Sequence, residues 1–272
     1  GLYNQKHIKQ CLFFANYVFD AHVSEVFTCL VNGHVLHIID DNTRNDILLL
    51  SNYINNNQVD IATIPPALLD LDEVLNLQTL VIAGEKTDKK IIQNYLKHNV
   101  NLINAYGPTE GTVCATLSHN LSICSSNIGF PIKNATVYIL DDLLKPLPYG
   151  SVGELYIGGI GLARGYINNP TLTNEKFISN PFQTVNEARK GLNAKLYRSG
   201  DLAKYLSDGS IEYIGRNDQQ IKINGYRIEV GEIENTLLGY DDIKQCAVVV
   251  KENNQRGRYL IAYYTKKQDA EN

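Results

Sequence analysis

Residues Leu77–Glu110 have the sequence LQTLVIAGEKTDKKIIQNYLKHNVNLINAYGPTE. The continuous apolar run Leu77–Ala83 predicts a buried parallel strand. The segment Asp88–His98 places its apolar residues on one face, which predicts an amphipathic helix. A second strand is expected over Asn101–Ala105, and it leads into the loop Tyr106–Glu110. The stretch therefore predicts a strand–helix–strand unit of an α/β fold, in which ligands bind at the carboxyl ends of parallel strands.

From about Asn127 the pattern changes to short strands separated by turns. Residues Thr136–Leu140 and Glu154–Ile157 flank a turn that contains proline and glycine, and we expect them to pair. The further elements expected are a loop with a short helix over Phe182–Lys195, a strand over Ile211–Ile214, a helix near Val230–Leu238, and strands near Cys246–Val250 and Tyr259–Tyr264. The second half of the chain is therefore expected to be β-rich.

The composition points to a small-molecule substrate. The chain has 272 residues and a formal net charge of -4, so nothing in its overall charge attracts nucleic acid or an anionic membrane. No apolar stretch approaches the roughly 20 residues that span a bilayer, and no basic-then-apolar leader marks the chain for export. The five cysteines are odd in number and contain no CxxC pair, which predicts reduced thiols and a cytoplasmic location. The chain contains no methionine, so we expect it to be a fragment.

Several glycine-rich segments follow one another in a fixed order. They are Asn104–Glu110 (NAYGPTE), Gly153–Tyr166 (GELYIGGIGLARGY), Tyr197–Ala203 (YRSGDLA) and Gly215–Glu234 (GRNDQQIKINGYRIEVGEIE). One such cluster alone is weak evidence, since glycines commonly serve turns. Together, from about Phe13 to the last residue, they resemble the adenylate-forming superfamily. Within it the chain is similar to adenylation domains of nonribosomal peptide synthetases, especially the aromatic-amino-acid-activating domains of the gramicidin and tyrocidine type.

The resemblance implies a partial adenylate-forming fold in which three parts follow along the chain. Residues 1–126 would form a parallel-sheet α/β subdomain with the amino-acid pocket and the adenine loop. Residues 127–217 would form a β-barrel-like subdomain with the ribose site. Residues 218–272 would hold the hinge and the start of a small α+β C-terminal domain.

The resemblance also implies an activity. In this family the carboxylate of an amino acid attacks the α-phosphorus of ATP and expels pyrophosphate. The aminoacyl group then passes to the phosphopantetheine thiol of a peptidyl carrier protein, and condensation domains use the product. Such chemistry depends mostly on positioning and on neutralising charge.

The motif positions assign roles in a nucleotide site. Tyr106 would stack on adenine, and Asn104 would hydrogen-bond its exocyclic amine. Thr109 would contact phosphate, and Glu110 would hold Mg²⁺, a cation that prefers oxygen ligands. Asp201 would accept both ribose hydroxyls. Taken singly, Tyr106 and Asp201 are as well explained as turn residues.

Further expected site residues lie in the last glycine-rich segment or just before it. Tyr213 would pack near the ribose, and Arg216 would pair with the α-phosphate as a catalytic group together with Thr109 and Glu110. Outside the motif, Arg216 is equally a solvated charge. Asp218 is expected to be the hinge of the small domain. By the same resemblance, Lys222 and Gly225 face the pantetheine channel.

The segment Phe19–His22 (FDAH) resembles the family's substrate helix, where the aspartate binds the substrate ammonium group. A buried carboxylate needs a cationic partner, and a free α-amino group would serve Asp20 in this way, although Asp20 is otherwise explained as a helix cap or an exposed residue. The pocket positions carried over are Asp20, Ala21, Ser24, Thr63, Val81, Ala83, Ala105, Val113 and Cys114. Most of these side chains are small and uncharged, which suits an aromatic ring.

Ser24 is the informative member of this set. Phenylalanine-activating relatives carry tryptophan at that position, whereas serine leaves space and adds a hydroxyl group that can meet a phenol. The set resembles a tyrosine pocket, so L-tyrosine is the expected substrate, with phenylalanine or tryptophan as weaker ones. For Val81, Ala83, Val113 and Cys114 taken singly, core packing is the alternative.

Two family parts are absent from the sequence. The phosphate loop lies before residue 1 in relatives, and the lysine that bridges the substrate carboxylate and the α-phosphate lies beyond residue 272. Because the loss of one preorganised electrostatic group costs ~10²–10³ in rate, we expect the chain alone to be nearly inactive. Two alternatives stay open: an acyl- or aryl-CoA ligase of the same superfamily, which Asp20 disfavours, and a non-catalytic binding module.

Overall fold

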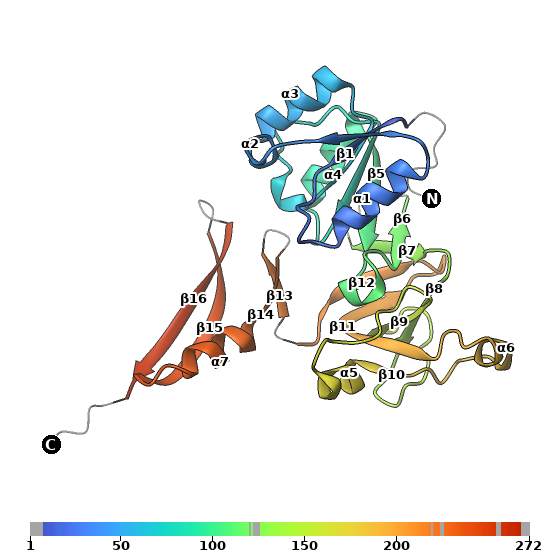
Figure 1. Cartoon of the computed structure of the whole chain (residues 1–272), viewed down its shortest axis with the longest axis vertical. Helices are drawn as coiled ribbons and strands as arrows, with labels where there is room; N and C mark the ends of the chain where they lie inside the picture. The colour runs from blue at the N-terminus through green and yellow to red at the C-terminus, as the bar shows by residue number, and fades with distance from the viewer. Residues whose placement is uncertain are drawn as a thin grey trace. The chain divides into compact units, whose positions relative to one another are not determined.

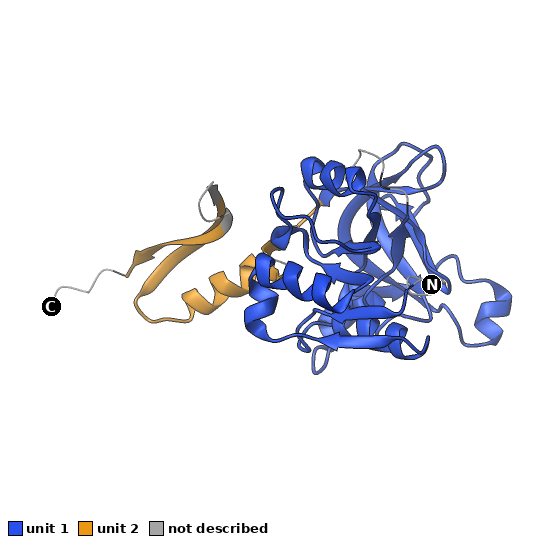
Figure 2. Cartoon of the chain, turned by 90° about the horizontal axis from the view of Figure 1, so that it is seen from above, with its two compact units in different colours: residues 1–215 blue, residues 216–272 orange. Residues whose placement is uncertain are grey.

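The strands predicted around Val81 and Ile103 lie in the middle of a larger sheet (Figure 1). The computed structural model describes residues 8–119, 121, 126–218, 220–223, 226–253 and 257–267. The chain divides into two compact units, Gly1–Gly215 and Arg216–Asn272, which Figure 2 shows in different colours. The expected boundaries at residues 126/127 and 217/218 remain predictions.

The first unit is built on a twelve-stranded sheet. Its strands are β1 (Gln10–Phe13), β2 (Val35–Ile38), β3 (Ile61–Ile64), β4 (Thr79–Ala83), β5 (Asn101–Tyr106), β6 (Thr116–Ser118), β7 (Asn127–Pro131), β8 (Ala135–Leu140), β9 (Gly153–Gly159), β10 (Phe177–Ser179), β11 (Lys195–Tyr205) and β12 (Ile211–Arg216). They run in the order β2-β1-β3-β4-β5-β6-β7-β12-β11-β9-β8, and β10 pairs with β11. Strands β1 to β5 are parallel, and the sheet becomes antiparallel from the β5–β6 pair onward.

Helices cover both faces of the parallel part of the sheet (Figure 1). The helices of this unit are α1 (Ala21–Leu30), α2 (Asp41–Asn45), α3 (Ile47–Asn57), α4 (Lys89–Lys97), α5 (Pro170–Lys176) and α6 (Val185–Arg189), with short 3₁₀ turns η1 (Pro66–Leu68) and η2 (Thr109–Gly111). Ile54 of α3 and Tyr95 of α4 pack in the core on one face, with Leu80 of β4. Cys29 of α1 packs on the other face, with Val81 of β4. Neighbouring residues of β4 thus enter opposite cores, as the alternation of a strand requires.

The predicted strand–helix–strand unit is confirmed as β4–α4–β5, with β4 and β5 parallel. The predicted hairpin is confirmed as the antiparallel pair β8–β9, and the short helix within Phe182–Lys195 is α6. The segment Tyr197–Ala203 differs from a simple turn, because it lies inside β11. Its pairing with β9 shifts register between Arg198 and Leu202, so a bulge accommodates the glycine.

The second unit contains the helix and strands expected near the end of the chain. Its elements are β13 (Gln220–Ile223), β14 (Tyr226–Glu229), α7 (Val230–Leu238), β15 (Ile243–Asn253) and β16 (Gly257–Lys266). The strands of the β15–β16 hairpin are longer than the expected strands Cys246–Val250 and Tyr259–Tyr264. Backbone pairing extends beyond these apolar residues in both directions, from Ile243 opposite Lys266 to Asn253 opposite Gly257. Helix α7 is held to β15 by Glu234, whose carboxylate accepts a 2.8 Å hydrogen bond from the Val248 N–H.

The described cysteines Cys11, Cys29, Cys114 and Cys246 are free thiols, whereas Cys124 lies outside the described residues. Within the part of the chain that the structure describes, no helix is long and apolar enough to cross a membrane.

Gly129 is predicted to be required where β7 pairs with β6. It has φ of +75°, and a Cβ atom there would lie 1.9 Å from the Leu117 carbonyl oxygen. We expect Gly129→Ala to lower the free energy of unfolding by about 3 kcal/mol or more, because the backbone must move. Gly150→Ala is the matched control: its φ is +83° but the space around it is open, so only ~1–2 kcal/mol is expected. Urea unfolding of both variants measures the difference, and equal losses would contradict the steric explanation.

Candidate functional site

The strands β3, β4 and β5 bring four of the expected pocket residues onto one face. Thr63 and Val81 are direct neighbours across the β3–β4 pair, and Ala83 and Ala105 are neighbours across β4–β5. Val81 and Ala83 are two positions apart on one strand, so all four side chains share the face that α1 covers. Val81 and Ala105 are buried, whereas Thr63 and Ala83 are half-buried toward the carboxyl ends of the strands.

Asp20 lies close to Cys114, although the chain separates them widely. Burial raises the pKa of the Cys114 thiol to about 12, and the nearby negative charge of Asp20 contributes. Asp20 occupies the N-cap position of α1 but makes no capping hydrogen bond with its side chain. Asp20, which is half-buried, is therefore not explained as a helix cap. Its neighbour Cys114 packs against the core cluster that contains Val81 and Ala105.

Helix α1 carries the other two pocket candidates. Ala21 is its first residue, and the Ser24 hydroxyl donates a 2.8 Å hydrogen bond to the Ala21 carbonyl oxygen. This bond uses the hydroxyl hydrogen of Ser24. The oxygen of Ser24 is then suited to accept a hydrogen bond from a ligand rather than to donate one.

The loop after β5 folds back tightly on itself. The Ala115 N–H donates to the Tyr106 carbonyl at 2.8 Å, and a Cβ at Gly107 would lie 2.5 Å from the Val113 carbonyl oxygen. Thr112 and Val113 both have positive φ, 61° and 67°, which is strained for β-branched residues. Such strain persists only where the surroundings enforce it, and here it sets the direction of the half-buried Val113 and Cys114 side chains.

Glu110 is held from the glycine-rich segment after β9. It is 7% exposed, and the Tyr166 hydroxyl donates to its Oε1 at 2.7 Å. The Ala163 N–H donates to the Glu110 carbonyl at 2.8 Å, and the Thr112 hydroxyl donates to the Gly161 carbonyl. Burial, followed by the bond to Glu110, raises the pKa of Tyr166, so this tyrosine remains a donor at neutral pH. Tyr166 ends the glycine-rich segment Gly153–Tyr166, and no role for it was predicted from the sequence.

Tyr106 and Asp201 meet directly. The Tyr106 hydroxyl donates to Asp201 Oδ2, and the ring of Tyr106 lies 6.1 Å from that of Tyr213 at an interplanar angle of 41°. Burial, followed by the charge of Asp201, raises the pKa of Tyr106 well above its usual value. An aromatic platform and a carboxylate suited to hydroxyl groups therefore lie side by side.

The bulge of β11 fixes the Asp201 backbone. The Asp201 N–H donates to the Ser199 hydroxyl at 3.0 Å, and the Gly200 N–H donates to Glu154 Oε1 at 3.2 Å. Near it, Asn104 donates through Nδ2 to the Asn127 carbonyl at 2.9 Å, so its Oδ1 is the atom suited to accept from an amine. Thr109, at the start of η2, is exposed.

Arg216 and Asp218 belong to the second unit. Arg216 donates through Nε and Nη2 to the two carboxylate oxygens of Asp218, at 2.7 and 2.6 Å, in a bidentate pair. Lys222 is half-buried on β13, and Gly225 lies outside the described residues. Arg216, the last residue of β12, is thus paired with a carboxylate and is not a simple solvated charge.

A magnesium ion would find one protein carboxylate at this site. In the described ranges, no group of three or more His, Cys, Asp or Glu side chains could hold a metal ion. Glu110 offers hard oxygen atoms, and a single carboxylate with substrate phosphates and water is a common Mg²⁺ environment. The residues present therefore fit Mg²⁺ bound together with a phosphate ligand.

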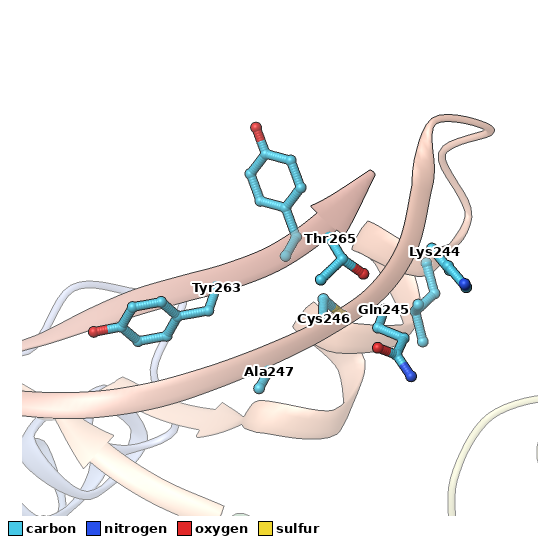
Figure 3. A pocket seen from close by; sticks show the side chains of 8 residues that line it. Lys244, Gln245, Cys246, Ala247, Tyr263 and Thr265 are labelled. Carbon is cyan, nitrogen blue, oxygen red and sulfur yellow. The ribbon is translucent and has the colours of Figure 1, made fainter. Parts of the chain in front are cut away.

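Of two pockets in the described part of the structure, one lies away from the candidate site. One of about 560 Å³ lies on the second unit between β15, β16 and α7, and Cys246, Tyr263 and Thr265 line it (Figure 3). None of the predicted site residues lines it. A smaller one, of about 140 Å³, lies on the first unit beside Thr112 and Cys114.

The chain is similar to known proteins of one family. Residues 3–167 match the family model described as AMP-binding enzyme. Tyrocidine synthase 1 of Brevibacillus parabrevis is 43% identical over 94% of the chain, and gramicidin S synthase 1 of Brevibacillus brevis is 42% identical over 92%. The chain covers only 23% of the length of each of these relatives.

Two solved structures are also similar. One, a nonribosomal peptide synthetase protein with adenylation and PCP domains, matches 97% of this chain and 47% of its own, with a TM-score of 0.85 and 28% identity. The other, a four-domain nonribosomal peptide synthetase bound to AMP and glycine, matches 96% of this chain and 20% of its own, with a TM-score of 0.69 and 33% identity. The fold is therefore the adenylate-forming fold expected from the sequence.

Tyr166→Phe is predicted to loosen Glu110 without unfolding the chain. Loss of the hydroxyl donor leaves a buried carboxylate oxygen less well satisfied, so we expect about 1–3 kcal/mol lower stability. Tyr205→Phe is the matched control, since Tyr205 donates at 2.9 Å to a neutral carbonyl, that of Val137. Its expected loss is about 1 kcal/mol. Thermal or urea unfolding of both variants tests the ranking, and a larger loss for Tyr205→Phe would reverse it.

Proposed function

Because the chain belongs to the AMP-binding enzyme family, in its nonribosomal peptide synthetase adenylation branch, we propose that it forms the amino-acid site of an ATP-dependent amino-acid-activating ligase. The reaction joins the carboxylate of the amino acid to AMP and releases pyrophosphate. The chain spans a minor part of its relatives' length, so the proposal concerns the parent protein.

The observation that carries the proposal is the position of Asp20. Its half-buried side chain lies near Cys114, and Cys114 packs against the cluster that contains Val81 and Ala105. An ammonium group bound there would neutralise the charge of the Asp20 carboxylate, while the side chain of the substrate packs against apolar residues. The similar synthetase bound to AMP and glycine supports an amino acid as the ligand class.

The proposed nucleotide site lies after the carboxyl end of β5. Tyr106 would offer its ring to adenine, and Asp201 would accept hydroxyl groups of the ribose in place of the Tyr106 hydroxyl that it accepts here. Thr109 is exposed and would donate to phosphate. When bound at Glu110, Mg²⁺ would neutralise phosphate charge as it develops. Arg216 would add a guanidinium to the α-phosphate, and its pair with Asp218 uses only two of its five N–H donors.

We propose L-tyrosine as the amino acid. Small residues at Ala83, Ala105 and Ser24 leave room for a ring, and the oxygen of Ser24 can accept the phenolic hydrogen because its own hydrogen is bound to Ala21. The remaining wall residues of the proposed pocket are Ala21, Thr63, Val81, Val113 and Cys114.

The proposed partners follow from the domains of the similar structures. The parent would pass its aminoacyl group to a phosphopantetheine-bearing carrier domain, as the PCP domain of the similar structure suggests. Condensation domains, which the family resemblance implies, would then use the product. Asp218 would act as the hinge between the two states, with Lys222 near the thiol channel. We propose that the protein works in the cytoplasm.

An acyl- or aryl-CoA ligase is the second candidate. A substrate without an amino group would leave the Asp20 carboxylate without a cation, which is costly for a half-buried charge. A non-catalytic binding module is disfavoured because Glu110, Asp201 and Arg216 are all present.

ATP–pyrophosphate exchange by the full-length parent, measured with each of the twenty amino acids, tests the proposal. We expect the highest kcat/KM with tyrosine. Asp20→Ala should lower it about 10²-fold, because a charge-assisted hydrogen bond contributes ~1.5–3 kcal/mol. Exchange only with acids that lack an amino group would establish the CoA-ligase alternative, and no exchange with any acid would leave the binding module.

The Ser24→Ala variant tests whether the pocket recognises the phenol group of tyrosine by a hydrogen bond or only by leaving space for it. If Ser24 accepts the phenolic hydrogen, the preference for tyrosine over phenylalanine should fall to the ~10–200-fold or less that shape alone allows. The measurement is the ratio of the two kcat/KM values in the parent and the variant. An unchanged ratio would remove Ser24 from the specificity argument while leaving the adenylation proposal intact.

A further inference from the structure

Helix α1 buries a carboxyl group that has no place in the proposed reaction. Glu25 is 0% exposed and lies on the inward face of the helix, four residues before the buried Cys29. Its Oε2 accepts hydrogen bonds from two consecutive backbone N–H groups, those of Phe14 at 3.1 Å and Ala15 at 3.0 Å. These residues follow β1 directly, so Glu25 ties α1 to the carboxyl end of that strand.

A second side chain holds the same peptide from the other side. Arg44 of α2 donates through Nε to the Phe14 carbonyl at 2.7 Å and pairs with Asp41. Arg44 also favours the charged form of Glu25, but burial dominates and raises the pKa of Glu25 to about 8. Glu25 is therefore mostly a neutral acid at pH 7. Its Oε2 still accepts from both N–H groups, and its Oε1, which has no hydrogen-bond partner in the structure, is the oxygen available to hold the proton.

The residues joined by Glu25 bracket the proposed pocket. The connection from Ala15 to Asp20 closes a short loop whose other end is the first turn of α1, where Ala21 and Ser24 lie. Ser24 immediately precedes Glu25, so a movement of the Glu25 side chain relative to β1 moves Ser24 and Asp20 with it. An apolar residue at position 25 would bury comparable surface but would leave the two N–H groups without an acceptor.

We propose that Glu25 is a positioning residue of the amino-acid pocket, which fixes α1 on the carboxyl end of β1 and thereby sets where Asp20 and Ser24 meet the substrate. The inference rests on the amino-acid pocket proposed above. Glu25 itself does not touch the substrate, and it acts through the helix.

The chain offers a matched control at the opposite end of the same strand. The Asp60 carboxylate accepts hydrogen bonds from the consecutive N–H groups of Lys9 and Gln10, at 2.8 and 2.9 Å, where β1 begins. Asp60 thus makes the same kind of tether at the amino end of the sheet, away from the edge at which ligands bind. Loss of either tether should cost stability, but only loss of Glu25 should change recognition of the amino acid.

The experiment compares Glu25→Gln, Glu25→Asp and Glu25→Ala with Asp60→Asn in the full-length parent. The KM values for tyrosine and for ATP come from pyrophosphate exchange, and hydrogen exchange by mass spectrometry reports the amides of Phe14 and Ala15. Glu25→Asp is included because its carboxyl group is retained but its shorter side chain cannot reach the two backbone N–H groups in the same way. This variant keeps the test valid if Glu25→Ala does not fold.

We expect Glu25→Asp and Glu25→Ala to raise the KM for tyrosine about tenfold to a hundredfold, because small misplacements of binding groups have effects of this size. The KM for ATP should stay within about threefold, and the two amides should exchange faster. Glu25→Gln, which imitates the neutral acid, should recover most of the affinity. Asp60→Asn should lower the melting temperature with the KM for tyrosine unchanged.

The pH dependence gives a readout that does not need catalysis. A carboxyl group whose pKa is about 8 in the folded chain and ~4.3 when unfolded makes the folded state lose stability as pH rises from about 5 to 8. Glu25→Gln should remove this loss. Arg44 is the charged group that acts on Glu25 in the described structure. Because an arginine stays protonated throughout this pH range, the change in stability comes from Glu25 and not from Arg44.

Each outcome decides something. Equal effects of the Glu25 and Asp60 variants on the KM for tyrosine, or unchanged exchange of the Phe14 and Ala15 amides in Glu25→Asp, would overturn the positioning role. If the parent itself shows no exchange with any amino acid, the proposed function fails. The amide exchange and the pH dependence of stability then still decide whether Glu25 holds α1 to β1.

Discussion

The parallel register of β3, β4 and β5 is the constraint on which the rest of the site depends. It places Thr63, Val81, Ala83 and Ala105 on one face, and a slip by a single residue would exchange that face with the core packed under α3 and α4. Both faces are covered, so both cores resist such a slip. The wall of the proposed pocket is therefore as rigid as the sheet itself, and the residues at its open edge are left to loops and to α1.

Much of this was accessible from the sequence. The apolar run of β4 and the one-sided helix α4 have the periods that their structures require, and the ordered glycine-rich segments identified the superfamily. Helix α1 was harder, because its pattern is inverted: Val23 and Phe27 are exposed, whereas Glu25 is buried. A prediction from the spacing of apolar residues would therefore place the wrong face of this helix against the sheet.

Contacts between distant segments were also beyond the sequence. The bond from Tyr166 to Glu110 joins positions 56 residues apart, and the bond from Tyr106 to Asp201 joins positions 95 apart. Neither follows from local periodicity, because tertiary packing alone brings the segments together. Both bonds hold a carboxylate by a tyrosine hydroxyl, and in both cases burial keeps the phenol protonated. Both carboxylates are thus held by neutral donors, which stabilise them without cancelling their charge.

The wall residues differ in how independent they are of one another. Thr63, Val81, Ala83 and Ala105 are neighbours in one ladder, so a larger side chain at one of them presses on the next, and their substitutions should be energetically coupled. Ser24 stands on a helix, and side-chain hydrogen bonds join it to Ala21 and Thr28 of the same helix. A substitution of Ser24 can therefore change the proposed pocket with an effect that adds independently to other substitutions. Changes at the strand positions require several substitutions made together.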